Sequence, residues 1–168
     1  MFSIGIDYGT NSVRAILTNT ANGRNVASAV FNYRRGENGI LLDKADPNVA
    51  RQSPQDYIEG FEYVLTKLLK QAKKIKNFSG DKIIGIGIDT TGSTPIPVTK
   101  ELVPLALVPE FKNNLNAQAW LWKDHSSLEE AQKITKIAEC IRPQYLRKCG
   151  GTYSSEWFFS KIWHCLNI

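Results

Sequence analysis

Cysteine is scarce in this sequence of 168 residues, and the three that occur, Cys140, Cys149 and Cys165, show no C-x-x-C spacing. A disulfide framework and a zinc site built on cysteine pairs are therefore not expected, and we expect free thiols in a reducing compartment. No apolar run approaches the roughly 18 residues that a membrane span needs. The first residues lack the basic segment of a signal peptide, so we expect a cytoplasmic protein without a membrane partner.

Acidic residues are outnumbered by basic ones, 16 against 21, which gives a net charge of +5. Much of the excess is a run of lysines between residues 67 and 76. Such a cluster is one signature of a nucleic-acid surface. The apolar residues between these lysines keep helical spacing, however, so we interpret the run as the solvated face of a helix and expect no nucleic-acid partner.

Tandem repeats, low-complexity tracts and an interdomain linker are also absent, so residues 1–168 are expected to form one domain. A chain of this length buries roughly 70% of the surface of its unfolded form, which allows a sizeable core.

Residues 1–19 show the clearest secondary-structure pattern of the sequence. An apolar run over residues 2–6 ends at Asp7, residues 8–12 form a turn, and residues 13–17 are apolar again. This alternation predicts a β-hairpin with an acid at the end of its first strand.

The predicted turn holds small and polar residues that suit a phosphate group. Gly9 lets the backbone approach a ligand where a Cβ would block it. Thr10, Asn11 and Ser12 add N–H and O–H donors. Asp7 is placed to hold Mg²⁺, directly or through water, because this cation prefers carboxylate oxygen. A tight hairpin with turn-favouring residues explains the stretch equally well when it is taken alone.

Beyond the hairpin, the pattern predicts a strand over 25–33 and, after the long connection 34–52, an amphipathic helix over 54–76. Ser53 is expected to cap this helix. The predicted apolar stripe of the helix comprises Ile58, Phe61, Leu65, Leu68, Ala72 and Ile75. The apolar run 83–88 predicts a central strand that is covered on both faces.

That strand stops at a second turn of acid and hydroxyl residues, 89–94, which parallels the first turn. Prolines break residues 94–109 into short predicted strands, and helices are predicted over 128–139 and from Ser154 or Ser155 onward. This order predicts an α/β fold with a mixed sheet, in which three antiparallel strands are followed by a parallel strand, reached through a right-handed crossover, with helices flanking the sheet.

Four motifs resemble one family. Residues 6–15, IDYGTNSVRA, are similar to the first phosphate-binding loop of the FGGY family of carbohydrate kinases, which has the ribonuclease-H-like core of the actin, Hsp70 and hexokinase superfold. Three stretches in the same order along the chain are similar to ribulokinases, namely 89–95 (DTTGSTP), 121–125 (LWKDH) and 150–157 (GGTYSSEW). This resemblance extends over essentially the whole chain and favours a phosphate loop over an ordinary turn.

The resemblance implies a kinase that transfers phosphate from ATP, with Mg²⁺, to the terminal hydroxyl of a ketopentose (ribulose), as in arabinose catabolism. It implies that Asp7 holds Mg²⁺ and that Arg14 stabilises charge on the transferred group. The implied ATP phosphate site comprises Gly9, Thr10, Asn11, Ser12 and Arg14.

The implied sugar pocket comprises Gly92, Ser93, Trp122 and Asp124. Gly92 would make room for a pentulose, Trp122 would pack its ring on the sugar, and Asp124 would accept hydrogen bonds from sugar hydroxyls. His125 has a weaker claim, and Glu156 is as well explained by a helix N-terminus.

Members of the family are much longer than this sequence and carry a second lobe with the adenosine pocket, a second phosphate loop and the aspartate that deprotonates the sugar. We therefore expect residues 1–168 to be the N-terminal, sugar-binding domain, inactive alone, with the C-terminal lobe as its partner. No catalytic base is assigned, although Asp89 and Asp124 are available carboxylates. Apolar surface at the docking face would favour homo-oligomers.

Two alternatives stay open at this point. The first is another sugar or polyol kinase of the same family, such as a xylulokinase, and only the resemblance of Gly92 and the 121–125 stretch argues against it. The second is a non-catalytic, actin-like module that binds a nucleotide or a sugar.

Overall fold

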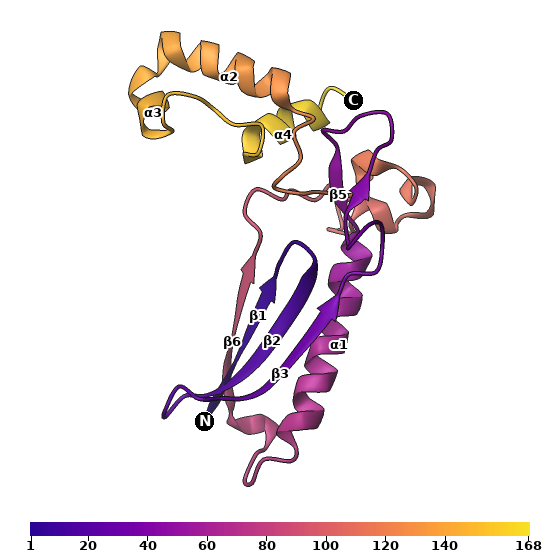
Figure 1. Ribbon diagram of the computed structural model, residues 1–168, viewed down its shortest axis with the longest axis vertical. Helices are drawn as coiled ribbons and strands as arrows, with labels where there is room; N and C mark the ends of the chain where they lie inside the picture. The colour runs from indigo at the N-terminus through magenta and orange to yellow at the C-terminus, as the bar shows by residue number, and fades with distance from the viewer. The chain divides into compact units, whose positions relative to one another are not determined.

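The computed structural model describes all residues from 1 to 168, and the chain divides into two compact units. The first, called the sheet unit here, comprises Met1–Ile40 and Ser53–Thr91. The second, called the helix unit, comprises Leu41–Gln52 and Gly92–Ile168. Each unit has its own sheet and its own helices, and each is described by itself (Figure 1).

The sheet unit contains one mixed sheet of four strands in the order β3-β2-β1-β6. The strands are β1 (Phe2–Tyr8), β2 (Ser12–Asn19), β3 (Asn25–Asn32) and β6 (Ile83–Thr90). The first three strands are antiparallel, and β6 runs parallel to β1. The predicted hairpin, the third strand and the parallel fourth strand are confirmed.

Helix α1 (Pro54–Ala72) lies along one face of this sheet, over β2 and β3 (Figure 1). Val13 and Leu17 of β2 are fully buried, as are Val64 and Leu68 of α1, and together with the apolar residues of β1 and β3 they form the core. Alternate residues of each strand face away from this core, so polar residues such as Asp7 lie on the opposite face.

The buried stripe of α1 differs from the predicted one. Leu68 and Ala72 are buried as expected, but Ile58 is 42% exposed and Gly60 lies in the buried stripe instead. The reason is steric, since a Cβ built at Gly60 would lie 2.4 Å from Cγ1 of Val13. The absence of a side chain lets the helix approach the sheet closely at this point and sets the face that it buries.

The ends of α1 also differ from the prediction. Ser53 makes no side-chain capping bond, and the helix ends at Ala72 rather than at residue 76. Asp56 in the first turn is buried, and its carboxylate accepts hydrogen bonds from the main-chain N–H groups of Arg34 and Arg35. Asp56 therefore ties the helix to the segment after β3, in addition to interacting with the helix dipole.

The prediction of a central strand over 83–88 is wrong in its position. β6 lies at the edge of the sheet, and Ile84, Ile86 and Ile88 are 61%, 56% and 60% exposed. The register explains this exposure. Ile86 and Ile88 pair with Ile4 and Ile6 of β1, so they lie on the same face of the sheet as the core. Helix α1 covers that face over β2 and β3, and β6 lies beyond these strands at the edge of the sheet.

The helix unit has a small sheet in the order β4-β5-β7. Its strands are β4 (Leu41–Leu42), β5 (Ala50–Gln52) and β7 (Ala119–Trp120), and its α-helices are α2 (Leu128–Ile141), α3 (Pro143–Lys148) and α4 (Phe158–Cys165). The connection 34–52 is thus partly ordered, because it contributes β4 and β5.

Short 3₁₀ helices complete both units. They are η1 (Gly80–Lys82) in the sheet unit, and η2 (Leu105–Leu107), η3 (Pro109–Phe111) and η4 (Leu115–Ala117) in the helix unit. The strands predicted over 94–109 reduce to a single bridge between Val98 and Pro104, because the prolines remove main-chain donors. No helix of the chain has the length and apolar character required to cross a bilayer.

Candidate functional site

Three charged residues lie in a row across neighbouring strands of the sheet unit. Asp7 of β1 pairs with Arg14 of β2 on one side and with Asp89 of β6 on the other. Residues that are paired in this way point to the same face, which is the face opposite α1. Arg14 Nη1 lies 4.0 Å from Asp7 Oδ2, and both side chains are substantially exposed. This row places two carboxylates and one guanidinium within reach of a ligand.

An open hollow of about 550 Å³ adjoins this row on the same unit. Its lining comprises Gly5, Ile6, Asp7, Arg14, Ala15, Ile16, Gly87, Ile88 and Asp89. Gly5 and Gly87 are register partners in β1 and β6, so the floor of the hollow lacks side chains at two adjacent positions. A Cβ at Gly5 would press on Ile16 at 3.3 Å, whereas a Cβ at Gly87 would meet nothing.

The turn between β1 and β2 is shaped by its own polar residues. The N–H of Gly9 donates to the carbonyl of Ser12 at 2.9 Å, and a Cβ on Gly9 would lie 3.3 Å from that oxygen. The side-chain amide of Asn11 donates to the carbonyl of Asn38 at 2.7 Å. Ser12 is buried, and its hydroxyl accepts from Nε of Arg14 at 3.5 Å. The predicted roles of these residues toward phosphate stay predictions. The structure shows that Gly9 and Ser12 also close the turn, and that Asn11 ties it to Asn38.

The carboxylates of Asp7 and Asp89 fit a hydrated Mg²⁺. This cation is bound in proteins by one or two carboxylates and keeps several waters. No cluster of three or more potential ligands from His, Cys, Asp and Glu occurs in the chain, so a dehydrated, all-protein cage is not available. The sequence alone marks Asp89 only as an available carboxylate, and its register with Asp7 makes it a second candidate ligand.

The predicted sugar residues lie in the helix unit. Gly92 is exposed, and a Cβ built on it would meet no atom within 4 Å. Ser93 follows with a φ of +52°, in the left-handed region that non-glycine residues adopt at a cost. Trp122 is partly exposed. Its predicted contact with a sugar stays a prediction, as do those of Gly92 and Ser93.

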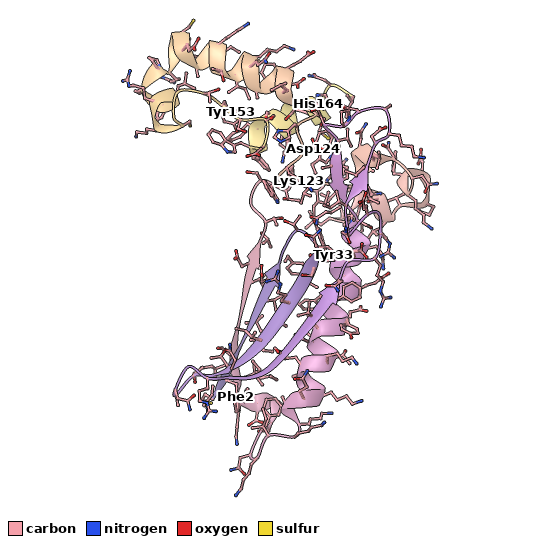
Figure 2. The ribbon with its side chains drawn as sticks, viewed as in Figure 1. Phe2, Tyr33, Lys123, Asp124, Tyr153 and His164 are labelled. Atoms are coloured by element: carbon pink, nitrogen blue, oxygen red, sulfur yellow. The ribbon has the colours of Figure 1, made fainter.

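Asp124 occupies a different environment from the one expected for a sugar ligand. It is 0% exposed and forms an ion pair with Arg51, which is also buried. Its oxygens further accept hydrogen bonds from the N–H of Ala50 at 2.7 Å and from the N–H and hydroxyl of Ser126 at 3.1 and 2.6 Å. Figure 2 shows Asp124 among side chains of the helix unit. The carboxylate therefore compensates a buried cation and is not open to a sugar in this structure.

The sequence alone does not single out Arg51. Its guanidinium lies over the ring of Trp120 at 3.6 Å, and its Nε donates to the carbonyl of Leu115 at 3.2 Å. Burial lowers the pKa of Arg51 to about 10, which still leaves the guanidinium charged at neutral pH. No local pattern around Arg51 signals this role, because its partners come from residues far along the chain.

His125, Ser155 and Glu156 form a further polar group in the helix unit. Nδ1 of His125 lies 2.8 Å from the hydroxyl of Ser155, and Nε2 lies 3.8 Å from Oε1 of Glu156. Glu156 precedes α4 by two residues, so it lies outside the first turn of that helix. The LWKDH and SSEW motifs are thus brought into contact through His125.

Comparison with known proteins identifies the family. The sequence profile of the N-terminal domain of the FGGY family of carbohydrate kinases matches residues 2–163. The chain belongs to this family. The ribulokinase of Vibrio parahaemolyticus is 40% identical over 94% of this chain and 27% of its own length. The ribulokinase of Halalkalibacterium halodurans is 37% identical over 99% of this chain and 30% of its own length.

Solved structures agree on the fold. A xyloylose kinase from Brucella ovis matches 99% of this chain and 30% of its own with a TM-score of 0.69 at 20% identity. The glycerol kinase of Plasmodium falciparum, solved with ADP, matches 99% of this chain and 28% of its own with a TM-score of 0.66 at 16% identity. The predicted fold class of this FGGY domain is confirmed. The chain spans about 30% of the length of these relatives.

Proposed function

We propose that residues 1–168 form the N-terminal part of an ATP-dependent ribulokinase, which phosphorylates ribulose at its terminal hydroxyl. The observation that carries this proposal is the identity of 35–40% to ribulokinases over nearly the whole chain. The side-by-side carboxylates of Asp7 and Asp89, next to Arg14, support it as the metal and phosphate side of such a site.

In this proposal the sheet unit binds the phosphates and the metal. ATP supplies the phosphoryl group, and Mg²⁺ neutralises part of its charge. Asp7 and Asp89 hold the hydrated cation from two adjacent strands, and the exposed guanidinium of Arg14 balances negative charge beside them. The turn formed by Gly9, Thr10, Asn11 and Ser12 presents main-chain and hydroxyl donors to phosphate oxygens.

The helix unit binds the sugar in this proposal. Gly92 leaves space for the ketose, Ser93 offers a hydroxyl, and Trp122 offers a ring face for C–H groups. We assign Asp124 a supporting role, because its carboxylate is buried against Arg51 and fixes the backbone that leads from Trp122 to Ser126. Activity also requires a carboxylate that takes the proton of the sugar hydroxyl, and no residue of 1–168 is assigned to that step.

The proposal is tested by an assay that couples ADP formation to a colour change, with the complete protein that carries this chain. Ribulose, xylulose, glycerol and gluconate are compared as acceptors at equal concentration. We expect the highest kcat/KM with ribulose. If activity is highest with xylulose, the substrate is a pentulose other than ribulose. Activity only with glycerol or gluconate would refute a pentulose substrate. Binding of ATP or sugar without turnover of any acceptor would favour a non-catalytic module.

A further inference from the structure

Lys161 of α4 is a lysine without exposed surface, at 0%. Its ammonium donates hydrogen bonds to the main-chain carbonyl oxygens of Ser93, Leu121 and Trp122, with Nζ···O distances of 2.9, 2.6 and 3.0 Å. An ammonium has three N–H donors and no acceptor, so each donor has one carbonyl partner. The hydrogen-bonding capacity of the group is therefore completely used.

No carboxylate forms an ion pair with this ammonium. The charged groups that act on it are Arg51, which disfavours its charge, and Glu156, which favours it. Burial is the larger effect, and it lowers the pKa of Lys161 to about 8. A buried charge without a counter-ion is costly unless its hydrogen bonds are complete, so the three carbonyl dipoles are what stabilises the ammonium at this position.

The three carbonyls belong to the segments that carry the proposed sugar residues. Those of Leu121 and Trp122 lie in the peptide groups on either side of the Trp122 Cα, so anchoring both fixes the backbone from which the indole projects. The third belongs to Ser93, whose backbone is in the left-handed region. A bond to its carbonyl helps to hold that less favourable conformation.

We propose that Lys161 is a positioning residue of the sugar subsite, whose ammonium fixes Ser93 and Trp122 relative to each other so that both contact one ketose. The inference rests on the proposed function, because it requires a sugar that these two residues bind. Lys161 has no exposed atom and does not touch the sugar itself. If Lys161 were only a crosslink of the core, its substitution would lower stability and leave sugar affinity unchanged.

The test compares Lys161→Met with the wild type in the complete protein, by steady-state kinetics in which ribulose and ATP are varied in turn. Methionine keeps the length and packing of the side chain and removes its charge and donors. We expect the KM for ribulose to rise about tenfold or more, because the backbone that carries Ser93 and Trp122 loses its three charge-assisted anchors and no longer holds both residues in place for one sugar. The KM for ATP should stay within about twofold, since its proposed residues belong to the sheet unit, whereas the three carbonyl partners of Lys161 belong to the helix unit.

Thr135→Val is the matched control in the same unit. The hydroxyl of Thr135 donates to the carbonyl of Ala131 and accepts from the N–H of Tyr153, both at 2.9 Å, so these two hydrogen bonds join segments other than those of Ser93 and Trp122. This variant should lose stability and keep the wild-type KM for ribulose. An equal rise of that KM in both variants would overturn the proposal, because any loosening of the helix unit would then weaken sugar binding.

Should Lys161→Met fail to fold, the wild type can be used instead, because raising the pH deprotonates the ammonium of Lys161 without a substitution. The neutral amine presents two donors and one lone pair to three carbonyls, so the KM for ribulose should rise from about pH 7 to about pH 9, a range in which Arg51, with its pKa of about 10, stays largely charged. Arg51, Glu156 and Cys165 also lie around Lys161. Burial raises the pKa of the Cys165 thiol, and the measurement is repeated in Cys165→Ser to remove that titration. A KM that does not change with pH overturns the proposal.

The failure of this inference is distinguishable from failure of the proposed function. If the wild-type protein phosphorylates no pentulose, the proposed function fails and the inference fails with it. If the wild type phosphorylates ribulose while Lys161→Met leaves the KM for ribulose unchanged, only the role of Lys161 is refuted.

Discussion

At the scale of the residue, aspartates of this chain occur in two kinds of environment. Asp7 and Asp89 lie side by side on an exposed sheet face, where their charge is available to a cation. Asp56 and Asp124 are buried and accept hydrogen bonds from the protein itself. The sequence points to Asp7 and Asp89 because each ends an apolar run. It does not reveal that Asp124 is buried, because the cation that requires it, Arg51, is distant in the chain.

Asp7→Asn should lower kcat with ribulose by about a hundredfold or more, because the amide keeps the shape of the side chain and removes the charge that we propose to hold Mg²⁺. The measurement is kcat as a function of Mg²⁺ concentration, with thermal unfolding as a check of the fold. The side chain is half exposed, so the unfolding temperature should hardly change. Full activity in this variant would refute the metal role of Asp7.

Asp124→Asn should instead destabilise the fold, by about 3–5 kcal/mol, because it leaves the buried guanidinium of Arg51 without its counter-ion. Urea unfolding measures this change. The matched control is Asp124→Asn combined with Arg51→Met, which removes both charges and should be less destabilised than Asp124→Asn alone. If Asp124→Asn costs less than about 1 kcal/mol, the carboxylate does not compensate Arg51.

At the scale of the element, apolar periodicity predicts that α1 is a helix but does not predict which face of it is buried. Its existence, its first residue and much of its apolar stripe follow from the sequence. Its buried face is set by Gly60, which hydrophobic patterning ignores, and by the close approach to Val13 that this glycine permits. Similarly, the apolar run of β6 is recognisable as a strand, but its place at the edge depends on which strands α1 covers.

Gly60→Ala should therefore destabilise the sheet unit by about 1–3 kcal/mol through overpacking, although alanine is the better helix former. The added Cβ would lie 2.4 Å from Cγ1 of Val13 and 3.0 Å from Cδ1 of Phe31. Urea unfolding again gives the measurement. The same substitution in a Val13→Ala background, where one of the clashing atoms is gone, should cost less. A stabilising effect of Gly60→Ala in the Val13→Ala background alone would confirm the steric origin, and a stabilising effect in the wild type would contradict it.

At the scale of the whole molecule, the candidate residues are divided between the two units. The metal and phosphate candidates lie in the sheet unit, and Gly92, Ser93 and Trp122 lie in the helix unit. The four motifs of the sequence predict this set of residues by resemblance. They do not reveal Arg51 or Lys161, because a buried cation that is held by distant partners leaves no local pattern.

Calorimetry on residues 1–168 alone tests which functions this part of the protein retains. We expect heat of binding with ribulose and no ADP formation when ATP is added, because no residue here is assigned as the base for the sugar hydroxyl. ADP formation that depends on ribulose in this chain alone would contradict the absence of a base. Lys161→Met should remove the heat of ribulose binding, and Thr135→Val should keep it.

The most direct test of the proposed function is the chemical identity of the product. The complete protein is incubated with ATP, Mg²⁺ and ¹³C-labelled ribulose, and the position of the phosphate is determined by carbon–phosphorus coupling in NMR spectra. The proposal predicts ribulose phosphorylated at its terminal hydroxyl, with one ADP formed for each sugar phosphate. Phosphate on another carbon, or ADP formed without any sugar phosphate, would contradict it.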